Sequence, residues 1–217
     1  MESADGVLAA LGARADRIEL CANLEAGGIT PSAGLIRWAV ETASRQMAVH
    51  VLIRPRGGGF AYSAAEEDVM SRDILSAKAA GADGVVVGAL TSSGAVDAEL
   101  TTRLISLARP LSVMFHRAFD EAADPSASFD AVLALGVDRL LTSGGAPTAI
   151  EGVELIESLV ARSGGRVEVM AGGGVTEHTA AEIMRRTGVR ELHFSARASA
   201  PELPLAERIA RIITAAG

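Results

Sequence analysis

Side chains able to transfer protons recur at the ends of apolar, strand-like runs of this sequence. Glu19 and His116 carry the carboxylate and imidazole groups that most often act as general acids or bases. Arg54 and Arg117 end comparable runs, and their charges would hold and tune those groups. We therefore predict a catalytic group of Glu19, Arg54, His116 and Arg117, in which Arg54 lies near enough to Glu19 to pair with it. The alternative is that this pair is purely structural.

Three consecutive glycines follow the sixth apolar run and precede a helical pattern. Gly172, Gly173 and Gly174 would leave bare N–H groups at a helix N-terminus, an arrangement that suits an anion. Ser195 and Arg197 would face these glycines from the next strand, so we predict that all five residues bind an anion. The alternative is a tight turn that needs glycine for its geometry alone. The second glycine run, 57–59, is interpreted as a loop over the mouth of the site.

Metal-binding patterns are sparse. The sequence has no paired-cysteine motif and no His-Glu-x-x-His motif. Cys21 could bind Cu(I) together with Met114, Met170, His116 or His193, since Cu(I) prefers soft sulfur donors. The alternative is that the cysteine and the methionines are ordinary core side chains. No strand-like run carries a lysine, which disfavours a Schiff-base aldolase, and no Ser/His/Asp triad stands out.

Composition excludes several classes of protein. The net charge is −7 with no basic cluster, which argues against a nucleic-acid partner. A single cysteine cannot form an intrachain disulfide and fits a reducing compartment. The acidic start 1–5 is unlike a signal peptide, and no apolar run approaches the roughly 20 residues of a membrane span. We expect a soluble, cytoplasmic protein that binds no membrane.

Seven apolar runs that could be strands begin 24 to 35 residues apart, the length of a strand with its crossover helix. They cover residues 17–21, 49–55, 84–90, 111–119, 139–144, 167–174 and 191–196. Helix-start signals lie between them: Ser63 with Glu66, Asp97, and Thr148 with Glu151. Further helices are expected to open at residues 30–32 and at 176. Glycines at 81, 136 and 188 end helices, whereas Arg14 holds the corresponding place before the first run.

Alternating strands and helices predict a parallel sheet, and we expect a TIM-type (β/α)8 barrel as one domain over residues 1–217. A doubly wound open sheet is the alternative, but no G-x-G-x-x-G follows the first run. The helix expected at 4–11 has too few residues before it for a strand, so only seven strands can be assigned. We expect the barrel to be open between 17–21 and 191–196, or closed by a segment borrowed from a partner, as in a homo-oligomer.

Several stretches together resemble the CutC family of copper homeostasis proteins. They are the stretches at 17–24, 27–32, 50–58, 81–86, 115–120, 141–144, 172–175 and 193–197, which cover nearly the whole chain in order. The resemblance implies a β/α barrel, a cytoplasmic location, a role in copper handling and Cu(I) as the ion bound. It also implies metal ligation by the cysteine at position 21 together with a cysteine on the family's first strand. This chain lacks that strand and its cysteine, and its segment 199–204 is short, so it departs from the family's copper pattern.

Two functions of different classes therefore compete, a copper-binding protein using Cys21 and an enzyme acting on a small anionic, phosphorylated or sugar-like compound. In the enzyme, Glu19 or His116 would be the general acid or base, and the glycines would hold the anion. The residues favour the enzyme. A scaffold acting through oligomerisation is a third alternative, but no long exposed apolar stripe supports it.

Overall fold

The computed structural model describes residues 1–195 and 203–217. Seven strands form its sheet: β1 (Arg17–Leu20), β2 (Ala48–Leu52), β3 (Gly84–Val87), β4 (Ser112–Phe115), β5 (Arg139–Thr142), β6 (Glu168–Gly172) and β7 (Glu191–His193). The α-helices are α1 (Ala4–Gly12), α2 (Ala33–Ala43), α3 (Ala64–Ala79), α4 (Ala98–Ala108), α5 (Pro125–Leu135), α6 (Val153–Ser163), α7 (Ala180–Thr187) and α8 (Leu205–Ala216). Two 3₁₀ turns, η1 (Leu24–Ala26) and η2 (Arg117–Glu121), follow β1 and β4.

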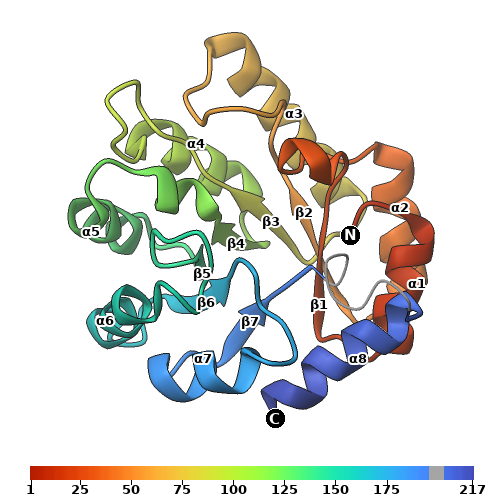
Figure 1. Cartoon of the computed structure of the whole chain (residues 1–217). Coiled ribbons are helices and arrows are strands. Elements are labelled where there is room, and N and C mark those ends of the chain that lie inside the picture. The colour runs from red at the N-terminus through yellow and green to blue at the C-terminus, as the bar shows by residue number, and fades with distance from the viewer. Residues whose placement is uncertain (196–202) are drawn as a thin grey trace.

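The sheet is parallel throughout, and its strands pair in sequence order from β1 to β7. It curls so that the helices surround it on the outside, as Figure 1 shows. This confirms the predicted TIM-like β/α architecture with seven strands. Within the described residues no strand pairing joins β7 to β1, and α1 and α8 pack against each other beside that opening. The strands are shorter than the apolar runs because the last residues of each run turn into the loops at the carboxyl end.

Alternate residues of the strands face two different environments. The outward set, which includes Val49, Val51, Val85 and Val87, packs in one large apolar core beneath the helices. A smaller cluster on the inner face joins one residue from each of six strand segments: Cys21, Leu52, Val86, Met114, Leu141 and Met170. The side chains thus alternate between the two faces of the sheet, as the pleat of a strand requires.

Most predicted helix boundaries are confirmed, and two are wrong. Ser63 and Glu66 form a capping box at α3, and Asp97 caps α4. Thr148 and Glu151 make the corresponding side-chain contacts, but α6 begins only at Val153, so these contacts close a turn. The helix expected to open at 176 begins at Ala180, because 176–179 form a hydrogen-bonded turn first.

The junctions before the strands share one conformation. Gly81, Gly136 and Gly188 have φ of 84°, 67° and 72°, the left-handed region that glycine adopts without steric cost. Arg14 has φ of 57° at the first junction, so a non-glycine residue takes the same strained conformation there. The glycine positions were therefore read correctly, and Arg14 is the exception in residue type but not in geometry.

Two of these junctions carry an aspartate that binds the neighbouring strand. Asp83, just before β3, accepts a hydrogen bond from Val49 N of β2 at 2.8 Å. Asp138, just before β5, accepts one from Val113 N of β4 at 2.7 Å. Each carboxylate thereby links the amino end of one strand to the residue just before the next strand. This contact fixes the register between the two strands.

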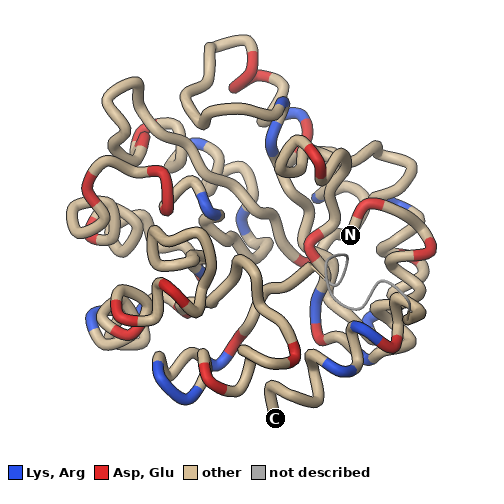
Figure 2. The backbone as a smooth tube through the Cα atoms, in the orientation of Figure 1, with Lys and Arg blue, Asp and Glu red and all other residues tan. Residues whose placement is uncertain are grey.

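Acidic and basic residues are both scattered over the outer helices, as the coloured tube in Figure 2 shows. Several form surface ion pairs between helices, such as Arg103 of α4 with Glu67 of α3. No helix in the described part of the chain is both long enough and apolar enough to cross a membrane.

Candidate functional site

Two histidines enter the interior of the curled sheet, one over the first residue of β3 and one over the glycine just after its end. A Cβ on Gly84 would lie 2.7 Å from the His50 ring, and one on Gly88 would lie 2.4 Å from the His116 ring. Both distances are far below van der Waals contact, so only glycine leaves room for the rings. The pairs are in register, since His50 is aligned with Gly84 and Phe115, next to His116, with Val87. Small residues on one strand facing large polar ones on its neighbours were a signal that the sequence analysis did not use.

His116 is fixed in one tautomer by the backbone. Its Nδ1 accepts a hydrogen bond from Ala118 N at 3.1 Å, so the neutral ring carries its proton on Nε2. Burial lowers the pKa of His116 to about 4; the negative charge of Glu19 opposes this, and the charge of Arg54 adds to it. Nε2 is buried without a hydrogen-bond partner in the described structure. Near pH 7 His116 therefore offers an N–H donor rather than a free base.

Arg54 does not pair with Glu19, contrary to the sequence-based expectation. Its Nη1 donates to Gly28 O at 2.9 Å and its Nη2 to Gly58 O at 2.5 Å. The guanidinium also lies over the Phe60 ring, 4.7 Å from its centre. Since the side chain reaches past the strand end into two loops, its partners are carbonyls that strand parity cannot predict. Arg54 thus holds the loop predicted to cover the mouth, and its role is structural.

Glu19 pairs instead with His193 of β7, whose Nε2 lies 3.4 Å from Glu19 Oε2. Burial alone would raise the pKa of Glu19, but the contact with His193 and the amino-terminal charge outweigh it and lower the pKa to about 2. Glu19 is accordingly a carboxylate at neutral pH. Because this contact spans from β1 to β7, Glu19 lies at the opening of the sheet rather than beside Arg117.

Below this pair, a second charged group closes the same opening. Arg17 of β1 and Arg139 of β5 contact Glu191 of β7 at 2.5 and 2.9 Å. The nearby His50 has its pKa lowered to about 4 by burial, and the charges of Arg17 and Arg139 act in the same direction. His50 is therefore neutral under physiological conditions, and its role here is packing against Gly84.

Arg117 belongs to a polar cluster at the carboxyl ends of β4 and β5. Its Nε donates to Asp120 Oδ2 at 2.8 Å and its Nη2 to Ser143 Oγ at 2.9 Å. Asp120 also accepts hydrogen bonds from Thr142 Oγ1 at 2.5 Å and from Gly145 N at 3.1 Å. The aspartate is buried while Arg117 is 44% exposed, so the cluster presents the guanidinium at the surface of the mouth. From the sequence, Asp120 was expected at this strand end, three residues after Arg117, but no role was assigned to it.

The glycine loop after β6 faces this guanidinium. A Cβ on Gly173 would lie 3.4 Å from Arg117 Nη1 and 3.1 Å from Ser143 Cβ, and Gly173 has φ of 109°. Gly173 O accepts from Ala149 N at 2.8 Å, which anchors the loop. Among the described residues, the N–H groups of Gly174 and Val175 have no hydrogen-bond acceptor. The loop and Arg117 thus form a corner where hydrogen-bond donors lie close together, as an anion requires.

The other predicted anion ligands are not brought to that corner. Ser195 lines a cavity between β1 and β7 together with Cys21, and within the described residues no hydrogen bond joins it to Gly172–Gly174. Arg197 lies outside the described residues. The structure therefore brings together Arg117, Gly173 and Gly174 and places Glu19 and Ser195 elsewhere.

Cys21 fits a copper ion poorly. Its thiol is buried in the inner apolar cluster, and burial raises its pKa. Met114 and Met170 share that cluster, but Arg17 Nη2 lies 3.4 Å from the Met170 sulfur. No three His, Cys, Asp or Glu side chains gather to hold a metal within residues 1–195 and 203–217. A protonated thiol beside a thioether that contacts a cation offers little to Cu(I).

Comparison with known proteins gives consistent results. Residues 1–198 match the CutC family. A human protein named copper homeostasis protein cutC homolog is 49% identical over 185 residues, which are 85% of this chain and 67% of that protein. A CutC family protein of Sinorhizobium medicae is 43% identical over 201 residues, covering 93% of this chain and 81% of that protein.

Solved structures agree on the fold. A putative copper homeostasis protein CutC from Streptococcus agalactiae is 39% identical with a TM-score of 0.79, over 82% of this chain and 88% of that chain. A thiamine phosphate pyrophosphorylase from Pyrococcus furiosus, 18% identical, superposes with a TM-score of 0.64 over 98% of this chain and 88% of its own. The latter likeness concerns the fold alone.

Proposed function

This chain belongs to the CutC family of copper homeostasis proteins, and on that premise we propose that it binds a small anionic compound of the phosphate class at the mouth of the barrel and acts on it as an enzyme. The observation that carries the proposal is the corner between Arg117 and the glycine loop. There a half-exposed guanidinium lies so close to Gly173 that a Cβ on this residue would be only 3.4 Å from Nη1.

The electrostatics of this corner favour an anion over a cation. Asp120 is the nearest carboxylate, but it is saturated by donors from Arg117, Thr142, Ser143 and Gly145. Its role is to hold Arg117 in place, which leaves Nη1 and the loop N–H groups for the ligand. A phosphate group accepts hydrogen bonds from guanidinium and backbone donors together, and the carboxyl ends of barrel strands are where such groups bind.

His116 supplies the chemistry beside the anion. It immediately precedes Arg117, and its Nε2–H is buried with no hydrogen-bond partner among the described residues. A neutral imidazole that donates can polarise a carbonyl or hydroxyl oxygen of the bound compound as negative charge develops there. This assigns His116 the part of an electrophile instead of a general base, because Nδ1 is occupied by Ala118 N. Glu19 is ionised and contacts His193, so at neutral pH it carries a negative charge and has no proton to donate.

Inorganic phosphate tests the binding step. Phosphate is titrated by calorimetry and by thermal shift against the parent chain, Arg117→Ala and Arg72→Ala. Arg72 is a matched control because it is an exposed arginine of α3 with a single ion pair to Asp68. We expect the first substitution to weaken binding at least tenfold and the control to leave it unchanged. Equal affinities in all three proteins, or no binding to the parent, would reject the anion site.

A copper function rests on one specific observation, the shared cluster of Cys21, Met114 and Met170. If these sulfurs bind Cu(I), titration against a competing chelator gives a submicromolar affinity that falls with Cys21→Ser and with Met114→Leu. Met70→Leu is the control, since Met70 belongs to α3 and is buried in the outer core. An affinity of micromolar or weaker, or one indifferent to Cys21, rejects copper as the ligand. The raised pKa of the thiol predicts that outcome.

A further inference from the structure

One loop contacts both halves of the candidate anion corner. It covers residues 143–152, between β5 and α6, and we call it the bridging loop. At its start, Ser143 Oγ accepts a hydrogen bond from Arg117 Nη2 at 2.9 Å. Further along, Ala149 N donates to Gly173 O at 2.8 Å. Because the guanidinium and the glycine loop come from distant segments of the chain, the bridging loop helps to set the distance between them.

The two ends of the bridging loop lie in direct backbone contact. A Cβ on Gly144 would be 2.2 Å from Gly152 O, and one on Gly152 would be 1.9 Å from Ser143 O. No side chain fits at either position, so both must be glycine for the ends to meet. Inside the loop, Ser143 Oγ donates to Ala146 O at 2.6 Å. This is the form of an Ω-loop, a compact segment packed by its own side chains.

Glu151 holds the middle of the bridging loop in shape. Its Oε2 accepts hydrogen bonds from Thr148 N at 3.1 Å and from Thr148 Oγ1 at 2.9 Å. The Thr148 methyl group lies against the glycine loop, since a Cβ on Gly174 would be 2.8 Å from Thr148 Cγ2. The next residue, Ala149, is fully buried and donates to Gly173 O. One carboxylate therefore fixes the part of the loop that contacts both glycines.

The hydrogen bond from Ala149 orients the peptide group between Gly173 and Gly174. This peptide is trans, and a trans peptide places its C=O and its N–H on opposite sides. Since the Gly173 carbonyl points at the bridging loop, the Gly174 N–H points away from that loop. In the described part of the chain this N–H has no acceptor, so it is available to a ligand.

We propose that Glu151 is a positioning residue of the anion site, which acts through Thr148 and Ala149 on the donors of the glycine loop. The proposal rests on the anion site proposed above, and it predicts an effect opposite to simple electrostatics. A carboxylate close to a bound anion repels it, so its removal alone would tighten binding. If Glu151 positions the donors, its removal weakens binding instead. Glutamine keeps an oxygen that can accept both hydrogen bonds, so it restores binding.

Inorganic phosphate is the probe, titrated by calorimetry against the parent chain, Glu151→Ala, Glu151→Gln and Glu154→Ala. Glu154 is the matched control, because it is an exposed glutamate in the first turn of α6 and its removal changes the charge without touching the bridging loop. We expect Glu151→Ala to raise the Kd about threefold or more, as the loss of hydrogen bonds that position a donor implies. The Kd values of Glu151→Gln and Glu154→Ala should be no higher than that of the parent.

Amide exchange shows whether the donors themselves move. Phosphate should slow exchange at Gly174 in the parent, because the anion accepts from that N–H. In Glu151→Ala, exchange at Ala149 should quicken and the protection of Gly174 by phosphate should fall. Thr148→Val is a second variant, which removes the hydroxyl bound to Glu151 but keeps a methyl group, and it should weaken binding in the same direction.

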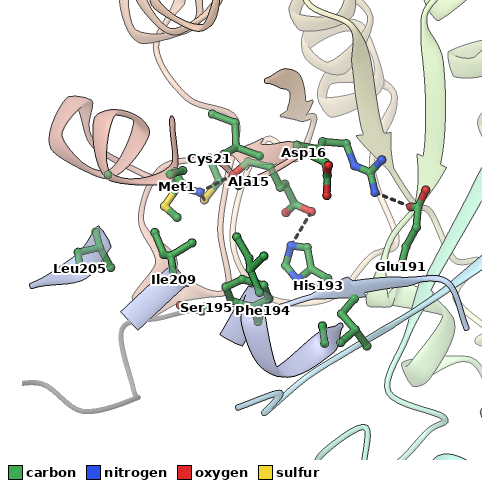
Figure 3. A pocket seen from close by; sticks show the side chains of 18 of the residues that line it. Met1, Ala15, Asp16, Cys21, Glu191, His193, Phe194, Ser195, Leu205 and Ile209 are labelled. Atoms are coloured by element: carbon green, nitrogen blue, oxygen red, sulfur yellow. Dashed lines mark hydrogen bonds and ion pairs between the residues drawn. The ribbon is translucent and has the colours of Figure 1, made fainter. Parts of the chain in front are cut away.

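The outcomes separate this proposal from the anion site itself. The cavity between β1 and β7, shown in Figure 3, is lined by none of residues 143–152 or 172–175, so phosphate bound there would not respond to Glu151. A parent that binds no phosphate rejects the anion site, and the role of Glu151 with it. A parent that binds, while Glu151→Ala binds equally well or more tightly, overturns the positioning role alone. That role is also overturned if Glu151→Gln is as weak as Glu151→Ala, because charge and not hydrogen bonding would then matter.

Discussion

Gly88→Ala is the sharpest test of how His116 is positioned. The added methyl would lie 2.4 Å from Cε1 and Nδ1 of the imidazole and 3.2 Å from the Ala118 side chain. The ring has little room to move, since it is buried and the Phe60 ring packs against it at 4.9 Å between ring centres. The substitution must therefore push His116 out of its position or shift β3 away from β4.

The cost follows from two contributions. Overpacking a filled interior costs about 1–3 kcal/mol. A displaced ring also loses the hydrogen bond from Ala118 N, which contributes about 1 kcal/mol. For a chain of this length each kcal/mol corresponds to roughly 2–4 °C, so we expect Tm to fall by about 5–12 °C.

Thermal and urea unfolding of four proteins would measure this. Gly59→Ala is the control, since a Cβ there meets no atom within 4 Å and its φ is not positive. His116→Ala and the double substitution complete a mutant cycle, in which Gly88→Ala should cost less once the ring is gone. If Gly88→Ala is as mild as Gly59→Ala, or if its cost is the same without His116, the steric argument is wrong.

Two further predictions concern electrostatics and the loops. The pKa values of His50 and His116 are lowered from 6.5 to about 4, so the unfolded chain takes up protons first as the pH falls. The contribution of these histidines to the free energy of unfolding should be fully present above pH 6.5 and should be lost as the pH falls toward 4. Urea midpoints measured across that range should depend less steeply on pH in His116→Gln than in the parent. A parent whose midpoint does not change with pH there would contradict this. Arg54→Lys loses the fork that joins Gly28 O to Gly58 O and should cost about 2 kcal/mol while speeding proteolysis within 57–59. If Arg54→Lys is cleaved no faster than the control Arg72→Ala, Arg54 does not hold this loop in place.

The sequence predicted the architecture well because its strongest signals are periodic. The seven strands were assigned from the spacing of apolar runs alone, and the structure has a strand within or overlapping each of them. The opening between β1 and β7 was predicted from the count of strands, since no segment before residue 4 could form one. Such features depend on local spacing, which a single sequence displays directly.

Pairings between long side chains were predicted less well. The expected Arg54–Glu19 pair failed because Arg54 reaches into two loops and Glu19 meets His193 across the opening. The role of Asp120 also went unseen, since its donors come from residues 22 to 25 positions later. These contacts depend on how loops fold back at the strand ends, which periodicity does not encode.

The junction aspartates have a consequence for how this fold can change. Asp83 and Asp138 bind the amino ends of β2 and β4, on the side of the sheet away from Arg117 and the glycine loop. Strand alignment is thereby set at one end of the molecule, while ligand contacts are made at the other. Loops such as 57–59 or 144–152 can then be lengthened or exchanged without a one-residue slip that would turn His116 or Met114 to the opposite face. Because the strands are anchored at their amino ends, the loops at their carboxyl ends can change in sequence and length.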